Sequence, residues 1–270
     1  MNWKNIQHCY IILIVYKMKG QNNIILKGSI IKLDTKGVMQ RYKIKVHLNS
    51  VTSESVHLGV FLAIVGGFLD AYTFVGRGGV FANAQTGNIV LVGIEISKGD
   101  FVQALMYVPP ILAFVLGVVV TEIIKKRSPL ILIRDSARVI LIIEIILLFI
   151  IGFLPNTVSD SFVNVVISFV SSVQICTFRK LVDSPYSTTM TTGNLRTASY
   201  EAYIAITKKN RESGIRSLRY FTIIFSFLFG AFVGGRATIY IGDKSIWIAA
   251  FILIFSLILF SIDEKICNSV

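Results

Sequence analysis

Two short polar segments carry the side chains best suited to bind a ligand in this sequence. Each contains Thr-Gly-Asn, as Thr86-Gly87-Asn88 with Gln85 before it, and as Thr192-Gly193-Asn194 with Arg196 two residues after it. Threonine and asparagine donate and accept hydrogen bonds, and glycine allows a helix to begin or break. We predict that these eight residues line the binding site of a small polar or anionic solute. Helix packing through small residues is the alternative interpretation.

Three further polar residues lie inside apolar segments, where an ionisable group is costly and marks a functional site by default. Asp70 and Tyr72 fall late in segment 57–76, and Glu144 lies between two isoleucines in segment 138–154. We predict that Asp70 and Tyr72 join the substrate site and that Asp70 and Glu144 bind a coupling proton or ion. Alternatively, Asp70 lies at the outer interface or pairs with Arg77, and Glu144 makes a structural hydrogen bond to a neighbouring helix.

The sequence lacks the residue combinations that most enzymes and metal sites require. The three cysteines have no CxxC or metal-ligand spacing, and the three histidines all lie at or before the start of the first apolar segment. There is no evident nucleophile–base pair and no GxxxxGK[ST] motif for ATP-driven transport. We therefore predict no enzymatic activity, no catalytic residue, no metal and no cofactor. An intramembrane enzyme would need Asp70 and Glu144 to form a close pair.

The composition indicates that transmembrane helices must position these residues. The chain is 54% hydrophobic and 16% charged, with a mean hydropathy of +0.70, whereas soluble domains are about 45–50% apolar and about 25% charged. Its net charge is +12, and the basic residues lie between the apolar segments. They do not form a basic helix with interleaved aromatic residues, so we expect lipid, and no nucleic acid, as a partner. The apolar segments are 57–76, 82–97, 101–124, 138–154, 161–180, 188–206, 217–236 and 245–262.

Charge placement favours six spans over eight. Segments 82–97 and 188–206 begin with polar residues, and if only the other six cross, every strongly basic loop falls on one side. We predict a cell-membrane protein with both termini in the cytoplasm, and with 82–97 and 188–206 as interrupted or re-entrant helices. Residues 53–263 form the transmembrane domain. Residues 1–50 are interpreted as a basic cytoplasmic leader, either disordered or upstream of the natural start, for which Met18 and Met39 are both candidates, the latter leaving residues 1–38 outside the natural protein.

The two polar segments belong to an internal repeat. Thr-Gly-Asn recurs after 106 residues, and Glu95 recurs at the same interval as Glu201. The shift divides the domain into repeat 1, at about 57–154, and repeat 2, at about 161–262. With three spans in each repeat, the two repeats insert in opposite orientations. The predicted fold is therefore an all-α membrane protein with six transmembrane helices and two interrupted helices, arranged as two inverted repeats, which is typical of transporters.

The same residues resemble a known family. Gly66-Gly67-Phe68-Leu69-Asp70-Ala71-Tyr72, Gly79-Val80-Phe81 and Gln85-Thr86-Gly87-Asn88 resemble the first half of the YoaK family of bacterial membrane proteins, and Thr191-Thr192-Gly193-Asn194-Leu195 resembles its second motif. The resemblance covers about residues 53–263. Gln85 and Thr191 stand where the family commonly has methionine. The resemblance implies a polytopic inner-membrane protein, without an established substrate or catalytic residues.

The inverted repeat and the interrupted helices favour a transporter or permease for a small polar or anionic solute. The alternative is a membrane receptor, scaffold or assembly factor that does not transport. That alternative predicts that the protein has no central polar cavity.

Overall fold

The computed structural model describes residues 23–26, 29–33, 39–43, 56–127, 132–155, 157–178, 180–181, 184–185 and 187–268. The chain divides into two compact units, one formed by Met1–Val51 with Cys267–Val270 and the other by Thr52–Ile266. The second unit corresponds closely to the predicted transmembrane domain. Most of the predicted leader, including residues 1–22, lies outside the described residues.

The first unit contains a small antiparallel sheet that the sequence analysis did not predict. Its strands, in the order β1-β2-β3, are Asn23–Leu26, Ser29–Leu33 and Met39–Lys43. Ile25 pairs with Ile30, and Ile31 pairs with Arg41. The β-branched isoleucines of this segment favour strands, which explains why it folds in this way locally.

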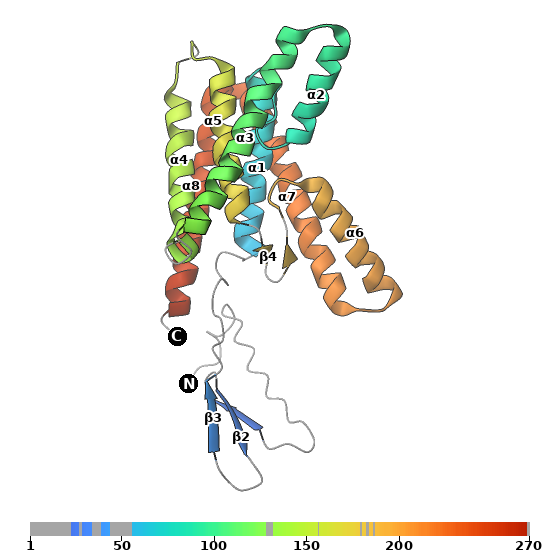
Figure 1. Ribbon diagram of the computed structural model, residues 1–270, viewed down its shortest axis with the longest axis vertical. Helices are drawn as coiled ribbons and strands as arrows, with labels where there is room; N and C mark the ends of the chain where they lie inside the picture. Colours follow the sequence, from blue (N-terminus) through green and yellow to red (C-terminus); the bar gives the residue numbers. More distant parts are fainter. Residues whose placement is uncertain are drawn as a thin grey trace. The chain divides into compact units, whose positions relative to one another are not determined.

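The second unit is helical (Figure 1). The eight predicted segments correspond to eight α-helices in its described part, joined by short connections that include the 3₁₀ turn η2 at Gly242–Ser245. The two-residue strands β4 and β5, Lys180–Leu181 and Ser184–Pro185, lie between α5 and α6. The helices are α1 Val56–Gly76, α2 Gln85–Lys98, α3 Phe101–Arg127, α4 Leu132–Phe153, α5 Asp160–Thr177, α6 Thr191–Thr207, α7 Arg211–Ile241 and α8 Ile246–Asn268.

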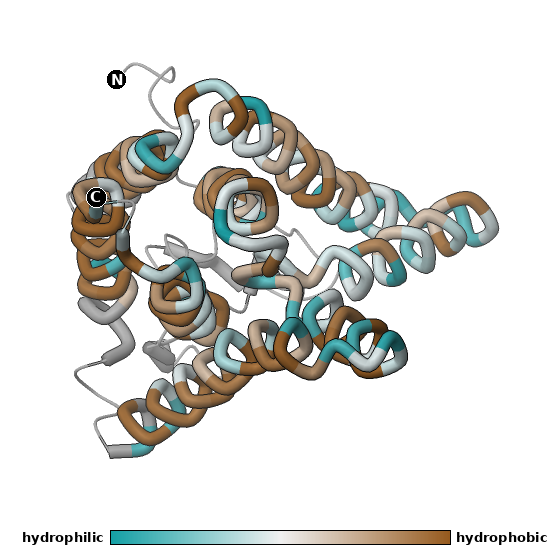
Figure 2. The backbone as a smooth tube through the Cα atoms, turned by 90° about the horizontal axis from the view of Figure 1, so that it is seen from above, coloured by the Kyte–Doolittle hydropathy of each residue, from teal (hydrophilic) through white to brown (hydrophobic). Residues whose placement is uncertain are grey.

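Four helical stretches of the described chain are long and apolar enough to cross a membrane. They are Val56–Gly76, Phe101–Ile124, Asp160–Thr177 and Arg211–Leu259. The last stretch contains α7 and the first part of α8, and the chain changes direction between these helices at Gly242, whose φ is 71°. Figure 2 shows hydrophobic residues along most of the unit, and large side chains such as Phe225 and Phe232 of α7 are each 64% exposed. Such surfaces suit a lipid environment, so the chain is a helical membrane protein.

Glycines determine how closely two pairs of helices approach. A Cβ on Gly67 of α1 would meet the carbonyl oxygen of Phe227 in α7, and a Cβ on Gly230 of α7 would meet the carbonyl oxygen of Ile64 in α1. In the same way, Gly117 of α3 lies against Ser172 of α5. These glycines are packing residues, because small residues allow membrane helices to approach closely.

Candidate functional site

After α1 ends at Gly76, the chain turns and runs back alongside α1. Gly78 and Gly79 have φ values of 80° and 74°, a conformation that glycine adopts at low cost and that ends the helix. The returning loop is fixed by Asp70, whose Oδ1 accepts hydrogen bonds from the N–H groups of Asn83, at 2.6 Å, and Ala84, at 3.3 Å. Asp70 therefore positions the residues immediately before α2.

The starts of α2 and α6 both lie beside the middle of α1, at Gly66. Asn83, before α2, donates from Nδ2 to the carbonyl oxygen of Gly66 at 3.1 Å. Thr189, before α6, packs so closely on Gly66 that a Cβ there would lie 2.6 Å from Thr189 Cγ2. Gly66 lies ten residues before the end of α1, which corresponds to roughly 15 Å of helix. From this point α2 runs toward one end of the unit and α6 toward the other (Figure 1).

The two asparagines of the Thr-Gly-Asn segments make equivalent hydrogen bonds. Asn88 binds the backbone of Phe81, with its Oδ1 2.9 Å from the nitrogen and its Nδ2 2.7 Å from the oxygen. Asn194 binds the backbone of Ser187 with the same two atoms, at 3.4 and 2.6 Å. Both bonded pairs span seven residues, and the second pair lies 106 residues after the first. Each asparagine therefore ties the loop before its helix to the first turn of that helix.

Replacing Asn88 by alanine should lower stability more than the same change at Asn194. Asn88 makes a third bond, from Nδ2 to Oε1 of Gln85 at 2.9 Å, and is fully buried. Each buried polar group that loses its partner costs about 1–3 kcal/mol, so we expect Asn88→Ala to lose at least about 2 kcal/mol and Asn194→Ala somewhat less. Thermal unfolding in detergent, followed by size-exclusion chromatography, measures both. Equal melting temperatures for wild type and Asn88→Ala would contradict this role.

Three buried oxygen atoms without a hydrogen-bond partner lie on the residues that surround this point. They are Oδ2 of Asp70 and the hydroxyl oxygens of Thr188 and Thr189. These three residues are 4%, 1% and 7% exposed, respectively. Buried polar groups are nearly always paired, so unpaired ones need an explanation, and a ligand is one. The sequence analysis did not select Thr188 and Thr189. Their only sequence signal is the polar run Ser187–Thr189 in front of the second motif.

The other predicted solute-binding residues differ in their exposure and in the atoms that they contact. Thr86, Thr192, Gly193 and Arg196 are exposed at the first turns of α2 and α6. Gly87 faces the ring of Phe81, whereas a Cβ on Gly193 would meet no atom within 4 Å. Gln85, like Asn88, bonds to the loop before α2, because its Nε2 donates to the carbonyl oxygen of Ala82 at 2.8 Å. Their roles in solute binding stay predictions.

Tyr72 belongs to an ion-pair cluster at the end of α1. Arg77 donates from Nε to the hydroxyl of Tyr72 at 3.0 Å. It also pairs with Asp160, the first residue of α5, at 3.1 Å and with Asp243 of η2 at 3.2 Å. Arg77 therefore joins three chain segments, whereas the side chain of Asp70 accepts hydrogen bonds from backbone N–H groups. The sequence offered no signal for the partners Asp160 and Asp243.

Glu144 is buried between helices, as its position in the sequence predicted. Its Oε2 accepts a 2.7 Å hydrogen bond from Nε2 of Gln174 in α5, and its Oε1 has no partner. Asp70 and Glu144 thus have separate hydrogen-bond partners. Within the described part of the chain, no group of three or more His, Cys, Asp or Glu residues is placed to hold a metal ion.

Comparison with known proteins identifies the family. A family model described as "Protein of unknown function (DUF1275)" matches residues 58–259, which is most of the chain. The chain belongs to the DUF1275 family. It is also 26% identical, over 137 residues, to the UPF0700 transmembrane protein YoaK of Bacillus subtilis (strain 168), in an alignment that covers 50% of this chain and 61% of that protein. The predicted resemblance to the YoaK family is confirmed. No solved structure matches the chain.

Proposed function

We propose that this DUF1275 protein is a permease of the cell membrane that moves a small polar solute without chemical conversion. The observation that carries the proposal is the meeting of α2 and α6 at Gly66, in the middle of α1. A helix that begins inside a membrane directs free N–H groups and the positive end of its dipole at that depth. Two such helices, starting at one place and running in opposite directions, are a known architecture for solute sites in secondary transporters.

The packing of the helices supports an inverted repeat with six spans. Under the shift of about 106 residues, α1 corresponds to α5, α2 to α6 and α3 to α7. Consistent with this correspondence, α1 packs along α7 of the second repeat, while α5 packs along α3 of the first. The hairpins α2–α3 and α6–α7 correspond as well. In this proposal α1, α3, α4, α5, α7 and α8 span the bilayer, and both termini lie in the cytoplasm.

The unpaired atoms suggest which solutes fit. Asp70 Oδ2 and the hydroxyls of Thr188 and Thr189 offer hydrogen-bond acceptors, and the two threonines offer donors as well. A neutral polar molecule with donor groups satisfies this set better than an anion, which Asp70 would repel. Thr86 and Thr192, at the exposed first turns of α2 and α6, lie on the path by which a solute reaches the site.

Swelling of vesicles that contain the full chain tests the proposal. The probes are glycerol and urea as neutral solutes, and potassium acetate and phosphate with valinomycin as anions, each compared with protein-free vesicles. We expect at least one neutral solute to enter faster with the protein. Thr188→Val and Thr189→Val should reduce that rate about tenfold, because one lost buried hydrogen bond of about 1.4 kcal/mol corresponds to a factor of ten.

Thr222→Val is the matched control for these substitutions. Thr222 is exposed on α7, and its hydroxyl bonds only to the carbonyl of Leu218 in its own helix, so its variant should retain wild-type flux. The valine variants at 188 and 189 remove hydroxyls without partners, so they should fold normally. If no probe enters faster than into empty vesicles, the permease proposal fails. If Thr222→Val slows entry as much as the other two variants, the assignment of Thr188 and Thr189 to the solute site fails.

A receptor, scaffold or assembly factor is the second candidate. It is favoured by the asparagines, since the amide groups of Asn88 and Asn194 are both occupied by backbone atoms of the protein itself. The flux experiment distinguishes the two candidates, because a scaffold would leave all four probes at the rate of empty vesicles.

A further inference from the structure

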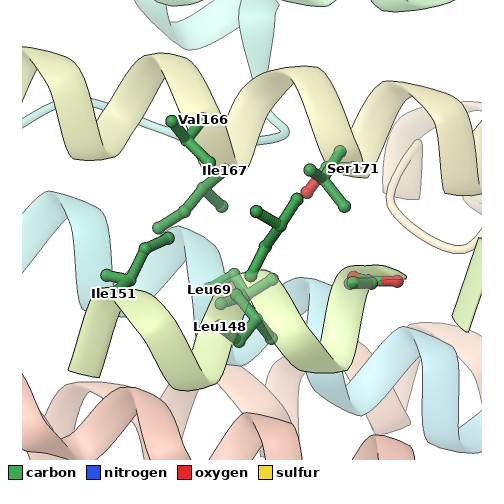
Figure 3. Close-up of a pocket in the computed structure, with 9 residues that line it drawn as sticks. Leu69, Leu148, Ile151, Val166, Ile167 and Ser171 are labelled. Atoms are coloured by element: carbon green, nitrogen blue, oxygen red, sulfur yellow. The ribbon is translucent and has the colours of Figure 1, made fainter. Parts of the chain in front are cut away.

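The pocket around Glu144 differs from the site at Gly66 because it is almost entirely apolar. Figure 3 shows Leu69 of α1, Leu148 and Ile151 of α4, and Ile167 and Ser171 of α5 gathered around it. The complete set of lining residues adds Glu144, Leu147, Val166 and Val170. The pocket has no room for a water molecule. Glu144 itself is 1% exposed.

The two oxygens of Glu144 have different environments. Oε2 accepts the hydrogen bond from Gln174, whereas Oε1 has no partner and cannot reach water in this pocket. An ionised carboxylate without a cation or a full set of donors is far more costly to bury than a neutral carboxyl group. We infer that Glu144 is a proton-binding site, occupied in this closed conformation and exchanging its proton when the α4–α5 contact opens.

No neighbouring charge offers an alternative way to neutralise Glu144. Among the described residues, Glu144 is the one ionisable group that lines the pocket. Asp70 of α1 is directed at the N–H groups of Asn83 and Ala84, and the described side chains of α8 carry no charge. The other ionisable groups with described side chains on these segments lie outside the pocket lining, and Asp160 and Asp243 pair with Arg77. They are His57 and Tyr72 of α1, Tyr107, Glu122 and Lys126 of α3, Arg138 of α4, Asp160 and Cys176 of α5, and Asp243 and Lys244 of η2.

A second cavity suggests where the pocket opens. A groove of about 440 Å³ is lined by residues of α3, α4 and α5, among them Pro109, Leu112 and Phe169. Leu147, Val166 and Val170 line both the groove and the Glu144 pocket, so these side chains form the wall between them. Separation of α4 from α5 at this wall would expose Oε1.

Carbodiimide labelling of the full chain in phosphatidylcholine vesicles tests the inference. N,N′-dicyclohexylcarbodiimide is apolar and reacts with protonated carboxyl groups. The acid proton moves to a carbodiimide nitrogen, the carboxyl oxygen bonds to the central carbon, and the adduct rearranges to an N-acylurea. Peptide mass spectrometry should detect this adduct on Glu144 at mildly acidic pH, with a loss of labelling at alkaline pH. Glu95 and Asp160, which are ion-paired to Lys98 and Arg77, should stay unlabelled in the same sample.

Two variants sharpen the test. Glu144→Gln should remove the adduct, and Leu147→Ala, which thins the wall toward the groove, should speed its formation. Infrared difference spectra between the two pH values provide a second readout that needs no reagent to enter. The wild type should lose a protonated-carboxyl band that Glu144→Gln lacks. The inference is overturned if that band is absent, or if Glu144→Gln retains it unchanged.

The use of this proton as a coupling ion rests on the permease proposal, but the site itself does not. Labelling and infrared bands report proton binding whether or not any solute crosses. A protein with a titrating Glu144 and no flux would contradict the permease alone, and a protein with flux and no carboxyl band would contradict only the proton site.

Discussion

Gly67→Ala should destabilise the helical unit by more than about 3 kcal/mol, at the upper end of what overpacking costs. The added Cβ would coincide with the carbonyl oxygen of Phe227 and lie 2.9 Å from the backbone nitrogen of Ala231. Both are backbone atoms, so no side-chain rotation relieves the clash, and α1 must move away from α7. We expect a fall in the melting temperature in detergent of at least about 6–12 °C, since 1 kcal/mol corresponds to about 2–4 °C in a domain of this size.

The control is Gly93→Ala on α2, where an added Cβ meets no atom within 4 Å. Alanine favours a helix by up to about 1 kcal/mol over glycine, so this variant should melt at or slightly above the wild-type temperature. Gly230→Ala should reproduce the loss from the opposite helix, because its Cβ would meet the carbonyl of Ile64. The double variant should lose less than the sum, since the helices separate only once. Wild-type stability of Gly67→Ala would disprove this close packing.

Arg77→Met should cost about 1.5–3 kcal/mol, the range for loss of a hydrogen bond to a charged group, because Asp160 and Asp243 are 42% and 26% exposed and can be rehydrated. Arg77 is 3% exposed, and its loss removes the donor that bonds to the hydroxyl of the fully buried Tyr72. Arg77→Lys should recover little of this loss, because a single ammonium cannot reach Tyr72, Asp160 and Asp243 together. Thermal unfolding of the three proteins in detergent measures the difference.

Lys98→Met provides the comparison with an exposed ion pair. Lys98 lies 2.8 Å from Glu95, but its side chain is 60% exposed, so water and salt screen this pair and its loss should change the melting temperature little. Added salt should weaken the Lys98 pair more than the Arg77 cluster. If Arg77→Met unfolds no earlier than Lys98→Met, the cluster does not hold α1, α5 and η2 together.

Local sequence was sufficient to predict the helices. The predicted segments 82–97 and 188–206 correspond to α2 at Gln85–Lys98 and α6 at Thr191–Thr207, because apolar runs and polar breaks are visible within a few residues. The start of α7 was placed too late, at 217 instead of Arg211. Asn210 caps the helix by accepting hydrogen bonds from the N–H groups of Glu212 and Ser213. That polar first turn does not contribute to an apolar run, so hydropathy did not include it.

The contacts between distant segments could not be predicted in the same way. Arg77 was paired with Asp70 in one interpretation because the two are close in sequence, yet it bonds to Asp160, 83 residues away, and to Asp243. Likewise, Thr189 meets Gly66 only because α6 begins beside α1. Such pairings depend on how the helices pack, and a single sequence does not contain that information.

The packing of α1 against α7 has a consequence for synthesis. The glycine face of α1 packs on α7, which begins at Arg211, so α1 enters the bilayer long before its partner exists. At roughly 5–20 residues per second, on the order of ten seconds of translation separate the two helices. During that interval lipid must cover the face of α1 at Gly67, whereas the partner of Asp70, Asn83, follows within 13 residues. The first helices must therefore persist in the bilayer without the contact between α1 and α7 until α7 has been synthesised.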